Sequence, residues 1–230
     1  MIMSLALQNK WLVLQWDVEG AFLNADIEHD LYVTDEGGEI WQLKKALYGL
    51  KQAGHEWCKK LRRILEESGL RQMVSDEGCY IGPKARIATH VDDLLVTVKD
   101  KAESQKILKT LRKHVKIEEK GTPSKFLGIN VEFKDKEIWL TQEKFIEKLC
   151  HMYNVTVPAT SQITTSPSAS IEPPEPTEPL TEKTKYQAIV GSLLHLSRNT
   201  RPDISVVTNL LGRRASNPSV RNLTAALRVL

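Results

Sequence analysis

The sequence has 230 residues, a net charge of +3, 41% hydrophobic and 27% charged side chains, values typical of one large or two small globular domains. Its three cysteines show no CxxC spacing, which argues against a disulfide framework and a zinc site and favours a reducing, intracellular (cytoplasmic) location. No apolar run reaches the roughly 20 residues of a membrane span, and the N-terminus lacks the basic region of a signal peptide, so we expect no membrane partner.

In chain order, the first residues are typical of the last turns of a helix, and a nearly all-apolar strand ending at Asp17 follows. Further strands are expected at 30–33, 39–43, 78–82, 86–91, 94–98, 126–133 and 137–140. Helices are expected at 51–67, 101–115, 142–153, 184–197, 201–212 and 219–230. The predicted fold class is therefore α+β.

Local signals mark several ends of these elements. Gly69 is a candidate C-cap and Thr141 a candidate N-cap. Thr200 and Asp203 have the spacing of a capping box, with Pro202 in the first turn. Residues 155–182 are rich in proline, serine and threonine without apolar periodicity, which predicts an extended linker.

Two adjacent carboxylates, Asp92 and Asp93, interrupt the apolar stretch HVDDLL at 90–95. Neighbouring residues of a strand face opposite ways, so we expect both to lie at the tip of a hairpin over 86–98, where aspartate often has only a structural role. Asp17 also ends a hydrophobic strand. Three carboxylates meeting at one edge would need a cation, and Mg²⁺ prefers such oxygen ligands. A two-metal site for nucleotidyl transfer follows, and the basic helix at 51–63 would face a phosphate backbone.

Five segments in one order resemble the reverse transcriptase of copia-type LTR retrotransposons. They are DVEGAFLNADIEHDLYV (17–33), LKKALYGLKQAG (43–54), HVDDLLV (90–96), FLGINVEF (126–133) and YQAIVGSLLHLSRNTRPDI (186–204). The resemblance implies a right-hand polymerase palm with thumb-like and connection helices and with the fingers largely missing. It divides the chain into palm and thumb (1–154), linker (155–182) and a helical connection segment (183–230) before a missing RNase H domain.

The same resemblance implies roles for individual residues. Asp17, Asp92 and Asp93 match the catalytic aspartates, and the Val18 carbonyl would complete the shell of two Mg²⁺ ions, with Mn²⁺ as an alternative. The nucleotide-binding positions would be Phe22, Tyr48, Gly49, Lys51 and Gln52, where Phe22 is the steric gate against a 2′-OH. The primer grip would be Phe126, Leu127 and Gly128. Lys120 aligns only loosely with a proton-donating lysine, and we expect an ordinary exposed lysine there.

The implied partners are a template with its primer, RNA or DNA, and deoxynucleoside triphosphates, in a virus-like particle if the chain belongs to a full element. His90 replaces the usual tyrosine, and residues 54–56 depart from the family pattern Pro-Arg-Ala-Trp, of which only Trp57 is kept. With the fingers upstream of residue 1, we expect the isolated chain to be an inactive remnant. Two alternatives are a non-catalytic fragment that binds nucleic acid through its basic helices and a structural subunit completed by another chain. The oligomeric state is left open.

Overall fold

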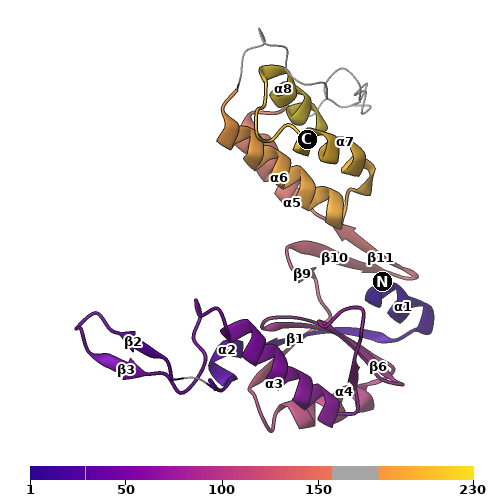
Figure 1. Cartoon of the computed structure of the whole chain (residues 1–230). Helices are drawn as coiled ribbons and strands as arrows, with labels where there is room; N and C mark the ends of the chain where they lie inside the picture. Colours follow the sequence, from indigo (N-terminus) through magenta and orange to yellow (C-terminus); the bar gives the residue numbers. More distant parts are fainter. Residues whose placement is uncertain (29, 157–180) are drawn as a thin grey trace. The chain divides into compact units, whose positions relative to one another are not determined.

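The computed structural model describes residues 1–28, 30–156 and 181–230, which form helices and sheets in two compact units (Figure 1). The first unit comprises Met1–Phe126 and Glu132–Ile138, and the second comprises Leu127–Val131 and Trp139–Leu230. In the described part of the chain, no helix has the length and apolar character needed to cross a bilayer. The expected mixture of helix and sheet is confirmed.

An antiparallel six-stranded sheet organises the first unit. Its order is β4 (Arg71–Gln72), β5 (Cys79–Ile81), β6 (Ala85–His90), β7 (Asp93–Val98), β1 (Leu12–Val18) and β8 (Ile117–Gly121). The N-terminal strand β1 is thus inserted between two strands from much later in the sequence. This insertion brings the end of β1 beside the start of β7, where the candidate carboxylates lie.

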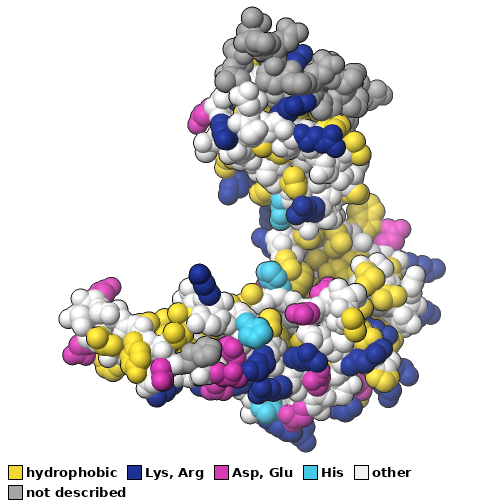
Figure 2. Space-filling view, viewed as in Figure 1, with side chains coloured by type: hydrophobic (Ala, Val, Ile, Leu, Met, Phe, Trp, Pro, Cys, Tyr) yellow, Lys and Arg dark blue, Asp and Glu magenta, His cyan; other side chains and the backbone are white. Residues whose placement is uncertain are grey.

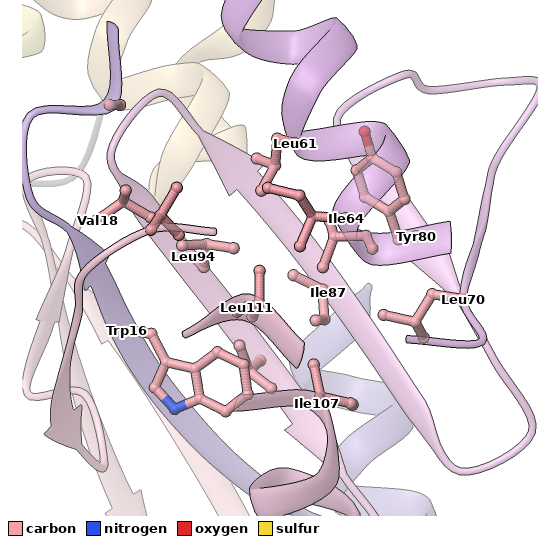
Figure 3. Packing of buried hydrophobic residues seen from close by; sticks show 14 of the residues in the cluster. Trp16, Val18, Leu61, Ile64, Leu70, Tyr80, Ile87, Leu94, Ile107 and Leu111 are labelled. Atoms are coloured by element: carbon pink, nitrogen blue, oxygen red, sulfur yellow. The ribbon is translucent and has the colours of Figure 1, made fainter. Parts of the chain in front are cut away.

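Two helices, α3 (Ala53–Glu67) and α4 (Lys101–Leu111), cover one face of this sheet (Figures 1 and 3). Their apolar stripes pack against alternate residues of β1, β6 and β7, and Figure 3 shows Leu61, Ile64, Ile107 and Leu111 facing Trp16, Ile87 and Leu94. Trp16 and Val18 are fully buried, whereas Asp17 between them is only half-buried. Since strand side chains alternate, Asp17 points to the opposite face of the sheet.

A smaller hydrophobic cluster lies on that opposite face. The N-terminal helix α1 (Ile2–Asn9) contacts β6 and β7 there, and Ala6 packs with Val13 and Leu95. Phe126 is partly buried against the same cluster. Helix α1 does not cover the end of β1 or the start of β7. The carboxylates there, Asp17, Asp92 and Asp93, all remain partly exposed.

Short elements connect β1 to α3. Helix α2 (Ala21–Asn24) follows β1 directly, and strands β2 (Tyr32–Thr34) and β3 (Ile40–Gln42) form the hairpin expected around Gly37 and Gly38. Tyr32, Ile40 and Trp41 of this hairpin are exposed. The hairpin prediction is confirmed, while α2 has no counterpart among the expected elements.

A three-stranded sheet with the order β11, β10, β9 contains β9 (Lys125–Phe126), β10 (Ile129–Lys134) and β11 (Glu137–Thr141). The single strand expected at 126–133 is wrong, because the chain turns at Leu127 and Gly128. Both residues have positive φ angles, 47° and 83°, which no extended strand allows.

The second unit is helical beyond that sheet. It contains α5 (Glu143–Tyr153), α6 (Lys183–Asn199), the 3₁₀ helix η1 (Pro202–Ile204), α7 (Ser205–Gly212) and α8 (Val220–Val229). Leu149 of α5 joins the core formed by α6, α7 and α8, and the Tyr186 hydroxyl donates a 2.8 Å hydrogen bond to the buried Leu211 carbonyl. Contacts therefore place α5 with the later helices, whereas the expected division into 1–154 and 183–230 stays a prediction.

Some predicted ends differ from the observed ones. Gln142, not Thr141, is the N-cap of α5, and the Thr200 hydroxyl donates instead to the Gln142 side chain at 2.9 Å. Asp203 accepts hydrogen bonds from Arg201, so no capping box forms there. Ser68, not Gly69, is the C-cap of α3, and Gly69 follows it with a positive φ of 89°. Most of the expected linker, at 157–180, lies outside the described residues.

Candidate active site

Strand register brings Asp17 of β1 opposite Asp93 of β7. Directly opposed residues share a face, so both side chains lie on the face away from Trp16. The Gln15 amide, two residues before Asp17, donates a 3.1 Å hydrogen bond to the Asp93 carboxylate and holds it on that face. The end of β1 and the start of β7 are thus neighbours in one sheet.

The turn between β6 and β7 consists of Val91 and Asp92. Val91 has a φ of 55°, although a β-branched residue strongly disfavours this left-handed region. The Trp57 indole N–H of α3 donates a 2.8 Å hydrogen bond to the Val91 carbonyl and anchors the turn from beneath. The expectation that both aspartates occupy the tip is therefore wrong, because Asp93 is already the first residue of β7.

Asp92 is bound to the segment that follows Asp17. Its carbonyl accepts a 2.8 Å hydrogen bond from the Val18 N–H, and its carboxylate accepts a 3.3 Å hydrogen bond from the Ala21 N–H. Gly20, with φ of 57°, makes the bend that turns the Ala21 N–H toward Asp92. Two hydrogen bonds thus tie Asp92 to the backbone that directly follows Asp17.

Lys120 of the edge strand β8 forms an ion pair with Asp17, with 2.8 Å between its ammonium nitrogen and the Asp17 carboxylate. This hydrogen bond is the main cause that raises the pKa of Lys120, and the carboxylates of Glu118 and Asp93 raise it further. The expectation of an exposed lysine is confirmed, whereas the ion pair was not expected. The Lys120 side chain is 39% exposed, but it is fixed at the candidate metal ligand.

The donor set suits a hard divalent cation, because it contains carboxylate and carbonyl oxygens only. Among the described residues, however, no group of three or more acidic, cysteine or histidine side chains is arranged to hold a metal. Asp93 is directed to Gln15, and Asp17 to Lys120. The convergence of all three aspartates on one cation therefore stays a prediction, whereas the chemistry of Asp17 and Asp92 fits Mg²⁺.

Two aromatic residues flank Asp92. The rings of Phe22 and Tyr48 have centroids 4.8 Å apart, and the Tyr48 hydroxyl lies 3.3 Å from an Asp92 carboxylate oxygen as a donor. Burial, followed by the nearby Asp92 charge, raises the pKa of Tyr48. Of the expected nucleotide-binding residues, Tyr48 contacts Asp92 directly, and Phe22 packs against Tyr48.

The remaining expected site residues occupy turns and a helix start. Gly49 has a φ of 96°, Lys51 is exposed, and Gln52 is the N-cap of α3 without a side-chain cap hydrogen bond. Leu127 and Gly128 form the turn between β9 and β10 and begin a stretch of the second unit. Their assigned roles stay predictions.

Three basic side chains of α3 are engaged by polar partners. Lys59 pairs with Glu28, Arg62 with Glu66 at 2.9 Å, and Lys60 donates to the Asn24 carbonyl at 2.8 Å. Figure 2 shows basic and acidic side chains interleaved on the surface of the first unit. These contacts weigh against nucleic-acid binding through this helix alone.

Three features of the site escaped sequence reasoning. Nothing in the sequence predicts the hydrogen bond of the Trp57 indole, and the strain at Val91 has no sequence signature. The register of Lys120 depends on β8, whose polar sequence IEEKG gives no strand pattern. The one sequence signal for the placement of Lys120 was its position in a charged run, two residues after Glu118.

The chain matches a known protein family over its first unit and beyond. The family model described as reverse transcriptase (RNA-dependent DNA polymerase) matches residues 1–167. The chain therefore belongs to the reverse transcriptase family, and it corresponds to the reverse transcriptase region of retrotransposon Pol polyproteins.

Particular relatives are transposon proteins of plants and yeast. The chain is 30% identical over 243 aligned residues to the retrovirus-related Pol polyprotein from transposon RE1 of Arabidopsis thaliana, covering 100% of this chain and 16% of that protein. It is 32% identical to the putative transposon Ty5-1 protein of Saccharomyces cerevisiae, covering 93% of this chain and 73% of that protein. The retrovirus-related Pol polyprotein from transposon TNT 1-94 of Nicotiana tabacum is 29% identical, covering 100% of this chain and 19% of that protein.

Proposed function

We propose that this chain carries the site for template-directed addition of deoxynucleotides to a primer 3′-OH. The observation that supports this most is the attachment of Asp92 to the backbone just after Asp17, through the N–H groups of Val18 and Ala21. These hydrogen bonds tie the turn that carries Asp92 to the end of the strand that carries Asp17, which supports a site of fixed charges such as phosphoryl transfer requires. In this proposal the six-stranded sheet with α3 and α4 is the palm, and the later helices are thumb-like and connection helices.

Asp17, Asp92 and the main-chain carbonyl of Val18 would hold Mg²⁺, or Mn²⁺ in its place, and Asp93 would have the least direct part. The bound ions would activate the attacking oxygen and stabilise charge on the leaving oxygen. The protein itself orients the two carboxylates and neutralises part of their charge before the substrate arrives. Asp93, hydrogen-bonded by Gln15, keeps β7 in register and so fixes Asp92 beside it.

Phe22 and Tyr48 would select and orient the incoming nucleotide. Phe22 is half-buried and packed on Tyr48, so its ring has little freedom to move away from a sugar 2′-OH. Tyr48 reaches Asp92 through its hydroxyl, which joins the aromatic pair to the carboxylates. Gly49, Lys51 and Gln52 would support the nucleotide and template, and Phe126, Leu127 and Gly128 the primer end.

The test is primer extension by the full chain on an RNA template with Mg²⁺, together with Mn²⁺ binding followed by electron paramagnetic resonance. We expect Asp92→Asn to lower any extension at least about a hundredfold, because it removes one carboxylate charge while preserving shape. Asp17→Asn and Asp92→Asn should both weaken Mn²⁺ binding. The matched control is Asp135→Asn, in the exposed turn between β10 and β11.

Unchanged Mn²⁺ binding in both Asp17→Asn and Asp92→Asn would refute the proposal, whatever the activity of the chain. The binding measurement matters because it reports on the carboxylates alone. Primer extension by Asp92→Asn at the rate of the unsubstituted chain would also refute the proposal.

A further inference from the structure

Three neighbouring strands carry a row of carboxylates across one face of the sheet. Asp17 of β1 is opposite Asp93 of β7 on one side and opposite Glu118 of β8 on the other. Directly opposed side chains on adjacent strands have Cβ atoms about 5 Å apart, and like charges at this spacing destabilise the pairing. Asp17, in the middle, experiences both neighbours, so the row needs a positive charge.

Lys120 supplies that charge because of an irregularity in β8. Trp16 is opposite Glu119, but Gln15 is opposite Gly121, so Lys120 is an extra residue without a partner position on β1. A bulge of this kind redirects a side chain from an edge strand. Here it places the Lys120 ammonium 2.8 Å from the Asp17 carboxylate, with 27% of the Asp17 side chain still exposed.

We propose that Lys120 is a built-in counterion that occupies Asp17 until a divalent cation displaces it, and that it thereby sets the affinity of the site for metal. This inference rests on the proposed function, in which Asp17 is a metal ligand. At its present distance, the Lys120 ammonium would repel a divalent cation bound to the same carboxylate. The ammonium must therefore move away from Asp17 when the cation binds.

The structure makes this withdrawal feasible. Lysine has a flexible four-carbon stem, and the Lys120 side chain is already 39% exposed, so its ammonium regains water at small cost. Glu118, two residues away on the same strand and the same face, is a second carboxylate for the released ammonium. Lys120 thus relieves the repulsion among the three carboxylates before metal binds. Because a metal ion must displace it, Lys120 also lowers the affinity of the site for metal.

The experiment measures the Mn²⁺ dissociation constant of the full chain by electron paramagnetic resonance at low ionic strength. Lys120→Gln should bind Mn²⁺ about three- to tenfold more tightly than the unsubstituted chain, since it removes the competing charge. Lys120→Met, which retains most of the alkyl stem, should give the same tightening, and Lys120→Arg should stay near the original affinity. The control is Lys116→Gln, which removes an equal charge from the Glu19 pair nearby and should change little.

Salt provides a second readout, which a merely structural role of Lys120 would not move. The difference between Lys120→Gln and the unsubstituted chain should shrink as ionic strength rises from about 0.01 M to about 1 M, because the Debye length falls from roughly 30 Å to roughly 3 Å. Circular dichroism checks that each variant is folded.

The outcomes separate this inference from the proposed function. If Asp17→Asn and Asp92→Asn both leave Mn²⁺ binding unchanged, the proposed metal site itself is wrong. If Asp17→Asn weakens binding but both Lys120→Gln and Lys120→Met bind Mn²⁺ like the unsubstituted chain, the counterion role is wrong. Equal tightening in Lys116→Gln would also overturn it, because the effect would then be one of overall charge.

Discussion

At the scale of single residues, the turn that carries Asp92 is strained. Val91 has a φ of 55°, a region that costs a non-glycine residue roughly 1–2 kcal/mol. The Trp57 hydrogen bond and the strand pairing on both sides keep it there. Strained backbone at a candidate site indicates that this turn is shaped to position Asp92 rather than to stabilise the fold.

The strain at Val91 gives a direct prediction. Val91→Asn should raise the free energy of unfolding of the first unit by about 0.5–1 kcal/mol, since asparagine tolerates the left-handed region far better. Val91 is 39% exposed, so little burial is lost. Urea denaturation followed by tryptophan fluorescence measures the change. Val91→Ile, which keeps the branched Cβ, is the control and should give no gain; a gain there, or a loss with asparagine, would contradict the strain argument.

At the scale of secondary-structure elements, α3 does more than cover the sheet. Trp57 is 1% exposed, and its indole N–H reaches through the core to the Val91 carbonyl at the turn between β6 and β7. One buried side chain therefore links the helix to the loop that presents Asp92. The position of the carboxylate depends on how α3 packs, as well as on the strands themselves.

Removing only the indole N–H tests this link. Trp57→Phe should lower the free energy of unfolding by about 1–3 kcal/mol, because the part-buried hydrogen bond to the Val91 carbonyl is lost and the smaller ring fills less volume. Mn²⁺ binding should weaken too, since the turn is no longer anchored. Leu61→Met on the same helix is a packing control that should leave Mn²⁺ binding unchanged. Weakened metal binding in Leu61→Met would show that any loosening of α3 has this effect.

Apolar pattern was sufficient to predict β1, the β6–β7 hairpin, α3 and α4, because each buries one clear face. It could not predict β8, whose residues IEEKG are held in the sheet by pairing with β1 rather than by their own hydrophobicity. The break at Leu127 was missed for a related reason, since a leucine with positive φ has no local signal. Motif resemblance located Asp17, Asp92 and Asp93, but the partners of these residues follow from strand register alone.

At the scale of the whole molecule, the two units have separate hydrophobic cores. The core of the second unit is formed by α5 to α8, and its buried members all come from residues 149–229. The main core of the first unit is formed by residues 16–115. Leu193 is fully buried at the centre of the second core, and none of the residues in its cluster belongs to the first unit.

A cavity at Leu193 should therefore destabilise the second unit selectively. Leu193→Ala removes a fully buried side chain and should lower the free energy of unfolding of that unit by about 2–5 kcal/mol. Hydrogen exchange measured by mass spectrometry reports the two units in one experiment, because amides of α6 and α8 exchange on opening of the second core and amides of β1 and β7 on opening of the first. We expect faster exchange in α6 and α8 and unchanged exchange in β1 and β7. Leu94→Ala, in the fully buried centre of the first core, is the reciprocal variant and should give the opposite pattern. Equal acceleration in both units after either substitution would mean that the chain unfolds as one cooperative body despite its two cores.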